Sequence, residues 1–174
     1  RGPRDLRGVA DAMMDDGNPN GFYLLKFDDV TLVPEFIPFP YGREAAQRLR
    51  IVLDPALDTT ESGINRGLLL ANTKVVVNLF DGGERDEVSL SLDGGRQVSM
   101  DYVVRSDPFM ERSYQQYADT DDAFTRPVAS SHIWEYSLPE NLMPGLHNVV
   151  VESEDEFGQH QRGVFTFELT GISQ

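Results

Sequence analysis

The chain has 174 residues, 40% of them hydrophobic, which is enough for one sizeable domain or two small ones without a disulfide or metal to hold them. It contains no cysteine, and this excludes cysteine nucleophiles, zinc–thiolate sites and iron–sulfur clusters. Its 29 acidic and 15 basic residues give a net charge of -14, which disfavours binding to nucleic acids and anionic membranes.

The start of the chain predicts a fragment or a processed product. The sequence lacks an initiator Met, and the charged residues 1–7 have no apolar segment behind them, unlike a signal peptide. No apolar run approaches the roughly 20 residues of a membrane span. Residues 1–50 hold 8 acidic and 7 basic side chains, whereas 51–174 hold 21 and 8. This asymmetry fits either two subdomains or one solvated acidic face.

The first elements in chain order are a hairpin and a strand. Apolar residues 21–27 turn at Asp28 and Asp29 and continue over 30–33, which predicts a β-hairpin. The prolines that follow predict an irregular or edge segment, because proline cannot donate to a ladder. Residues 47–53 resemble a third strand. The polar residues 54–72 then predict a boundary between an N-terminal β subdomain and the rest of the chain.

The second part predicts a β-sandwich. The run 74–80 is apolar enough for a central strand, and residues 87–92 alternate between apolar residues and serine. A turn at 93–95 leads into a return strand over 97–104. Apolar and polar residues alternate again in the two segments that flank a turn at 155–158. Short strands separated by turns rich in Gly and Asp are typical of a β-sandwich.

One helix interrupts the strands. Ser106 or Asp107 suits its N-cap, Pro108 suits its first turn, and residues 109–118 contain no helix breaker. The sequence therefore predicts a mainly β protein, an Ig-like antiparallel β-sandwich with one short helix and an N-terminal β-hairpin subdomain. The expected organisation is a linker over 1–20, the β subdomain over 21–72 and the sandwich over 73–170.

The three histidines do not form a metal motif, because their spacings of 15 and 13 fit no compact ligand set. His132 shares a strand face with Trp134, which favours a packed imidazole with a hydrogen-bond partner over a metal ligand. His147 and His160 lie near turns, and we expect both to be solvated.

Two further groupings suggest catalysis or metal binding but lack what that chemistry needs. The acidic turn 119–122 is not an EF-hand, because Phe124 occupies the position of the glycine that makes the sharp turn. Ser130 and Ser131 stand beside His132, but adjacent strand residues point to opposite faces, and the chain has no Gly-x-Ser-x-Gly elbow. The residues alone predict a soluble sandwich that is not an enzyme.

Three stretches of the chain resemble one known family. Residues 13–23, MMDDGNPNGFY, resemble the junction in secreted bacterial calcineurin-like metallophosphoesterases, where the catalytic domain leads into the C-terminal domain. Residues 119–134, DTDDAFTRPVASSHIW, resemble the middle of that C-terminal domain, and residues 142–158 resemble its closing hairpin. The resemblance runs from about residue 2 to residue 169.

The resemblance implies a non-catalytic C-terminal domain, secreted or periplasmic, separated from its enzyme. The family's catalytic half holds two divalent metal ions with Asp-x-His, Gly-Asp and Gly-Asn-His motifs, and none of these occurs in this chain. We therefore expect no cofactor here and two metal ions in the absent catalytic domain. The expected partner is that catalytic domain in cis, with no nucleic acid and no membrane span.

Two function hypotheses from different classes stand beside each other. The first is a module that docks on the catalytic domain and shapes its substrate cleft, with Arg126 as a contact to phosphate or partner. The alternative, purely structural interpretation is that Arg126 forms an ion pair with an acidic residue of 119–122. The second hypothesis is an independent binding module for glycans or cell-surface material, with Tyr114, Tyr117 and Trp134 as a stacking platform. The candidate interface or substrate-wall residues are Arg126, His132, Trp134, Asp119 and Asp122.

Overall fold

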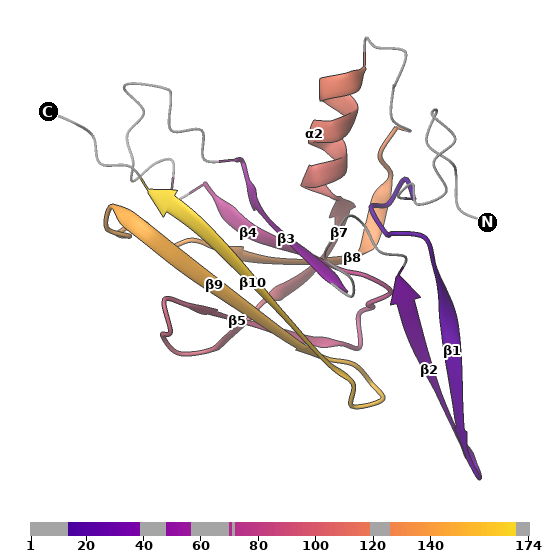
Figure 1. Ribbon diagram of the computed structural model, residues 1–174. Helices are drawn as coiled ribbons and strands as arrows, with labels where there is room; N and C mark the ends of the chain where they lie inside the picture. Colours follow the sequence, from indigo (N-terminus) through magenta and orange to yellow (C-terminus); the bar gives the residue numbers. More distant parts are fainter. Residues whose placement is uncertain (1–13, 39–47, 57–69, 71, 119–125, 170–174) are drawn as a thin grey trace, which may run out of the picture.

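The computed structural model describes residues 14–38, 48–56, 70, 72–118 and 126–169 (Figure 1). Two antiparallel four-stranded sheets, a separate two-stranded hairpin and one helix confirm the predicted mainly β sandwich. The sheets have strand orders β10-β9-β5-β6 and β3-β4-β8-β7. The elements are β1 (Gly21–Asp28), β2 (Thr31–Pro38), β3 (Leu49–Asp54), β4 (Lys74–Leu79), β5 (Glu87–Leu92), β6 (Val98–Ser99), β7 (Asp101–Ser106), α2 (Pro108–Tyr117), β8 (Ala129–Ser137), β9 (Gly145–Glu154) and β10 (His160–Leu169).

The main core lies between the two sheets. Alternate residues of each strand point inward, so that Val75 and Val77 of β4 share one cluster with Val149 and Val151 of β9. Trp134 of β8 lies in this cluster with 1% of its surface exposed, and its ring meets Tyr102 edge-on, with 5.3 Å between the ring centroids. Trp134 is therefore a core residue.

Helix α2 follows β7 and contacts β3, in the sheet with strand order β3-β4-β8-β7 (Figure 1). The side chain of Asp107 accepts a hydrogen bond from the backbone nitrogen of Phe109 at 2.8 Å, as the cap prediction requires. Met110 of the helix and Val76 and Ile133 of the sheet are buried but lie outside the main core. Val76 and Ile133 alternate with core-facing residues of β4 and β8, so both side chains are buried on the outer face of this sheet. No helix in the described part of the chain is long and apolar enough to span a membrane.

The return strand expected over 97–104 is two strands in two different sheets. β6 pairs with β5, whereas β7 pairs with β8. Met100 is buried at the point where the chain crosses between the sheets. β6 and β7 each bury one side against the same core. The alternating sequence pattern therefore continues through Met100, where the chain changes sheet.

β3 lies inside the sandwich, although the sequence assigned it to the N-terminal subdomain. It pairs antiparallel with β4, and its residues Leu49 and Leu53 belong to the main core. A Cβ atom at Gly163 of β10 would overlap the side chain of Leu49, so glycine is what allows these two sheet edges to approach. The boundary expected over 54–72 therefore does not separate β3 from the sandwich; within it, 57–69 and 71 lie outside the described residues.

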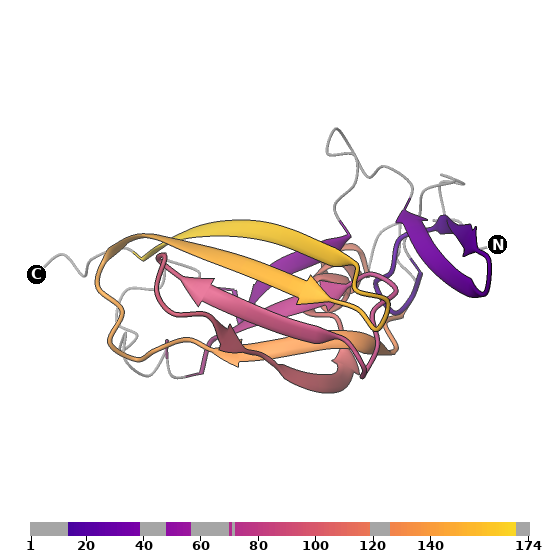
Figure 2. The same ribbon diagram turned by 90° about the horizontal axis from the view of Figure 1, so that it is seen from below.

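The predicted first hairpin is present, and it projects from one end of the sandwich (Figures 1 and 2). Its register runs from Gly21↔Pro38 to Asp28↔Thr31. Both strands are sheet edges, which is why prolines fit within β2 without breaking a ladder.

Replacing the buried indole tests whether Trp134 acts as a core residue. Trp134→Ala should lower the free energy of unfolding by about 3–5 kcal/mol, because it leaves a large cavity between the sheets. Urea denaturation measures the change. Val164→Ala, at an exposed position of β10, is the control and should stay within about 0.5 kcal/mol of the parent. A similarly small effect of Trp134→Ala would contradict the assignment.

Candidate functional site

The residues ahead of the first hairpin are fixed against the sandwich. We call residues 14–20 the junction segment. The backbone nitrogen of Met14 donates to the carbonyl of Asn18 at 2.7 Å, and that of Gly17 donates to the carbonyl of Met14 at 3.0 Å. Gly17, Asn18 and Pro19 are buried. The segment is therefore a compact turn packed on the fold, where the sequence predicted a linker.

Asp107 is the centre of a buried polar cluster that holds this turn. Its side chain is 1% exposed, and its Oδ2 accepts hydrogen bonds from Arg50 at 2.6 Å and from Asn78 at 2.8 Å. Arg50 also donates to the carbonyl of Gly17 at 3.3 Å, and its guanidinium lies 4.3 Å from the ring centroid of Phe109. Burying a carboxylate is costly unless such partners satisfy its oxygens. One side chain thus joins the helix, β3, β4 and the junction segment.

Gly17 is required at the point of closest approach. Its φ is +89°, in the left-handed region that favours glycine. A Cβ atom there would lie 2.5 Å from Oδ2 of Asp107 and 2.8 Å from Nδ2 of Asn78. The turn can therefore reach the buried cluster only because this residue has no side chain.

The start of β8 runs beside the junction segment. The backbone nitrogen of Val128 donates to the carbonyl of Asp15 at 3.1 Å, and Nε2 of His132 lies 3.7 Å from Oδ2 of Asp16. Nδ1 of His132 donates to the carbonyl of Gly82. The expected packed imidazole with a hydrogen-bond partner is confirmed. Two of the stretches that carry the family resemblance are far apart in the sequence, and these contacts bring them together in space.

Opposing effects act on the pKa of His132. Burial lowers the pKa, but the interactions with the Asp16 carboxylate and the Gly82 carbonyl outweigh it, so the pKa lies above its usual 6.5. The same contact with His132 lowers the pKa of Asp16 below its usual 3.8, against the effect of burial. The pair is therefore an ionic link between β8 and the junction segment at mildly acidic pH.

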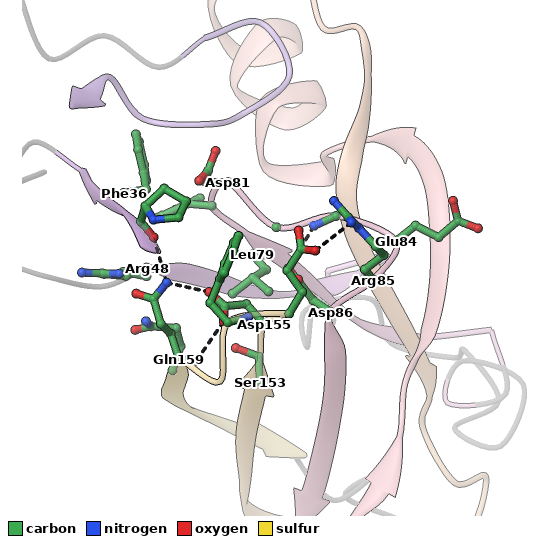
Figure 3. Close-up of a pocket in the computed structure, with 17 residues that line it drawn as sticks. Phe36, Arg48, Leu79, Asp81, Glu84, Arg85, Asp86, Ser153, Asp155 and Gln159 are labelled. Carbon is green, nitrogen blue, oxygen red and sulfur yellow. Dashed lines mark hydrogen bonds and ion pairs between the residues drawn. The ribbon is translucent and has the colours of Figure 1, made fainter. Parts of the chain in front are cut away.

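A cavity of about 450 Å³ opens at the base of the hairpin (Figure 3). Its walls come from the hairpin, the loop between β4 and β5, and the turn between β9 and β10. The hydroxyl of Tyr23 donates to Asp81, and Nε2 of Gln159 donates to the carbonyl of Pro34 at 2.9 Å. These contacts fix the hairpin to the sandwich and shape the cavity.

The cavity is lined by an excess of carboxylates. Arg48 and Arg85 stand among Asp81, Glu84, Asp86, Asp155 and Glu156. Burial raises the pKa of Asp86, and the nearby acidic side chains raise it further. A phosphate ester would be repelled by this field, so the cavity does not suit a phosphate group. In the described part of the chain, no group of three or more His, Asp or Glu side chains is placed to hold a metal ion.

The candidate interface residues do not form one group. Trp134 lies in the core, so the stacking platform proposed for a glycan-binding module loses its tryptophan. His132 lies at the junction segment, and exposed Arg126 borders a depression of about 230 Å³ beside α2. Asp119 and Asp122 lie outside the described residues. The interpretation in which Arg126 pairs with one of them therefore stays a prediction.

The expectation of a solvated His147 is wrong, because 7% of this residue is exposed. Its Nδ1 lies 2.7 Å from Oδ2 of Asp93, and its Nε2 lies 2.8 Å from the carbonyl of Met143. The alternation of β9 places His147 on the same inward face as Val149, and the nearby turn masked this in the sequence. His160, at the other turn, has a side chain that is 71% exposed, as expected.

The cluster around Asp107 was missed in the sequence, where this residue appeared only as a helix cap. One signal was present. Asn78 is a polar residue inside the apolar run 74–80, and a buried amide in a central strand needs a polar partner. The identity of that partner depends on pairings between distant strands.

Adding one methyl group at Gly17 tests the anchor. Gly17→Ala carries a backbone penalty of about 1 kcal/mol for its positive φ, and contact with Asp107 should add about 1–3 kcal/mol of destabilisation. Gly94→Ala is the matched control, because Gly94 also has a positive φ of +69° but has no atom within 4 Å of the added Cβ. Urea denaturation compares the two variants. Equal losses would mean that the close approach has no energetic importance.

A pH series tests the ionic link between His132 and Asp16. The pKa of His132 is raised on folding, so this residue stabilises the fold fully below about pH 6.5, and the stabilisation is lost as pH rises through the folded-state pKa. The pKa of Asp16 is lowered on folding, so this residue stabilises the fold above about pH 3.8, and that stabilisation is lost as pH falls through its folded-state pKa. His132→Gln should therefore cost most near pH 5, about 1–2 kcal/mol, and less at pH 8.

Thermal unfolding across this pH range gives the comparison, with His160→Gln as the control because its imidazole is exposed. A cost of His132→Gln that does not change between pH 5 and pH 8 would contradict the ionic link.

A family model described as the C terminal of calcineurin-like phosphoesterase matches residues 1–160. No curated protein and no solved structure matches the chain. The match includes the junction segment, the start of β8 and the turn between β9 and β10. The chain therefore belongs to the family of C-terminal domains of calcineurin-like phosphoesterases.

Proposed function

We propose that this domain docks on a phosphoester-hydrolysing domain ahead of it in the same polypeptide and helps to shape that domain's substrate cleft, without catalytic groups of its own. The observation that carries the proposal is the anchored junction segment. Gly17 is held by Arg50 and lies against Asp107, so the chain arriving from the preceding domain meets a fixed point on the sandwich. A flexible tether would need no such buried cluster.

The sequence supports an accessory role. The Asp-x-His, Gly-Asp and Gly-Asn-His motifs that hold two metal ions in the family's catalytic half are absent from all 174 residues. Those two ions activate a water molecule and stabilise the charge of the phosphate during hydrolysis. We place that chemistry, together with a secreted or periplasmic location, in the parent enzyme as part of the same proposal.

The mass and metal content of the native polypeptide test this function directly. We expect a chain clearly larger than 19.5 kDa that holds two divalent transition-metal ions, measured by mass spectrometry and elemental analysis. A free chain of this length without metal would contradict the proposal. It would leave the independent binding module, which a glycan array could examine.

Arg126 offers a separate test of contact with the substrate or the catalytic domain. If its exposed guanidinium lines the cleft, Arg126→Ala in the full-length enzyme should lower kcat/KM for a phosphate monoester about 10-fold, the range of one lost charge-assisted hydrogen bond. Arg162→Ala is the control, because Arg162 is an exposed arginine on β10. Unchanged kinetics for Arg126→Ala would remove this role from the residue.

A further inference from the structure

The first hairpin has one face without charge. Cross-strand pairs place Tyr23 opposite Phe36, Leu25 opposite Pro34, and Phe27 opposite Leu32 on the same side of the ribbon. We call these six residues the apolar face. The opposite side is mixed: it carries the charged residues Lys26, Asp28 and Glu35 among the apolar residues Phe22, Leu24, Val33 and Ile37. Only one side of the ribbon is therefore free of charge.

Much of the apolar face is open to solvent. Phe27 is 77% exposed and Leu32 is 46% exposed, and Tyr23 and Leu25 are each exposed by about half. A two-stranded hairpin alone in water is marginally stable, and it gains stability when an apolar face packs on another element. The contacts with the sandwich come from the base and the middle of the hairpin, through Tyr23 to Asp81 and through the carbonyl of Pro34 to Gln159. The tip of the apolar face therefore lacks the cover that such a ribbon needs.

The apolar face continues into the cavity at the hairpin base. Phe36 and Pro34 belong to the face and also line the cavity, where they meet the acidic side chains of the β4–β5 loop and the β9–β10 turn (Figure 3). The combined surface is an apolar ribbon that leads to an acidic recess. It fits a partner with an apolar patch beside basic side chains.

We propose that the apolar face, with the acidic recess at its base, is the surface that docks on the phosphoesterase domain of the same polypeptide. This inference rests on the proposed function and names its interface. The hairpin begins at Gly21, directly after the junction segment, so this surface lies next to the point where the chain would arrive from the preceding domain. A basic group from that domain would relieve the repulsion among the carboxylates that face Asp86.

A second copy of the chain fits this surface less well. Each copy carries a net charge of -14, and pairing two acidic recesses across a symmetric interface would bring like charges together. The phosphoesterase domain needs no such symmetry. The charge pattern therefore favours docking within one polypeptide.

The experiment uses the full-length phosphoesterase that carries this domain. The test variant is Phe27→Ser combined with Leu32→Ser, a cross-strand pair at the tip of the apolar face. The control is Leu146→Ser combined with Val164→Ser, because both residues are exposed apolar positions of the sandwich, at 70% and 51%. All four sites are exposed enough that serine should leave the fold intact, and circular dichroism checks this.

Cleavage between the two domains by dilute protease reports docking. We expect the hairpin variant to be cleaved at least about tenfold faster than the parent, and the control within about twofold of it. Backbone amides of the wild-type hairpin should also exchange slowly with solvent, a measurement that needs no variant. Analytical ultracentrifugation should give a monomer for all three proteins.

The outcomes separate the interface from the function. Slow cleavage of all three proteins would leave docking in place but overturn the assignment of the hairpin. Rapid cleavage of the wild type, with rapid exchange of its hairpin amides, would overturn both the interface and the docking function. If the wild type is a dimer and the hairpin variant is a monomer, the apolar face binds a second copy of the chain, and the proposal is overturned.

Discussion

The arrangement of this domain depends on one buried carboxylate. Asp107 caps α2 with one oxygen and accepts hydrogen bonds from Arg50 and Asn78 with the other. Taking a carboxylate out of water is costly, and the cost is recovered only when every partner is in place. The helix, two neighbouring strands and the junction segment are therefore positioned by the same ion pair. Apolar packing builds the sandwich, but this polar cluster decides where the chain ahead of it is held.

Much of the fold was predictable because its helix and strands depend on residues that are close together in the sequence. The alternation in residues 87–92 and the cap at Asp107 each depend on a few adjacent residues, and both appear as predicted. What failed depended on distant partners. The switch between sheets at Met100, the place of β3 in the sandwich and the burial of His147 follow from which strands pair, and strand pairing is not encoded in a short window.

The candidate site was less accessible from sequence than the fold. The resemblance identified the family and selected residues 13–23 and 119–134, whose described parts meet at Asp15 and Val128. It did not indicate which side chains hold them, because Arg50 and Asn78 lie outside both stretches. The sequence also did not indicate that apolar residues of the first hairpin are exposed. An alternating pattern is the same whether a strand face is covered by its own domain or by another.

The polar cluster also bears on the order of assembly. Arg50 and Asp107 are 57 positions apart, and Arg50 and the carbonyl of Gly17 are 33 positions apart. Contacts between residues so distant in sequence carry a larger loop-closure entropy than local contacts do. We therefore expect the junction segment to be secured after β3, β4 and α2 have come together.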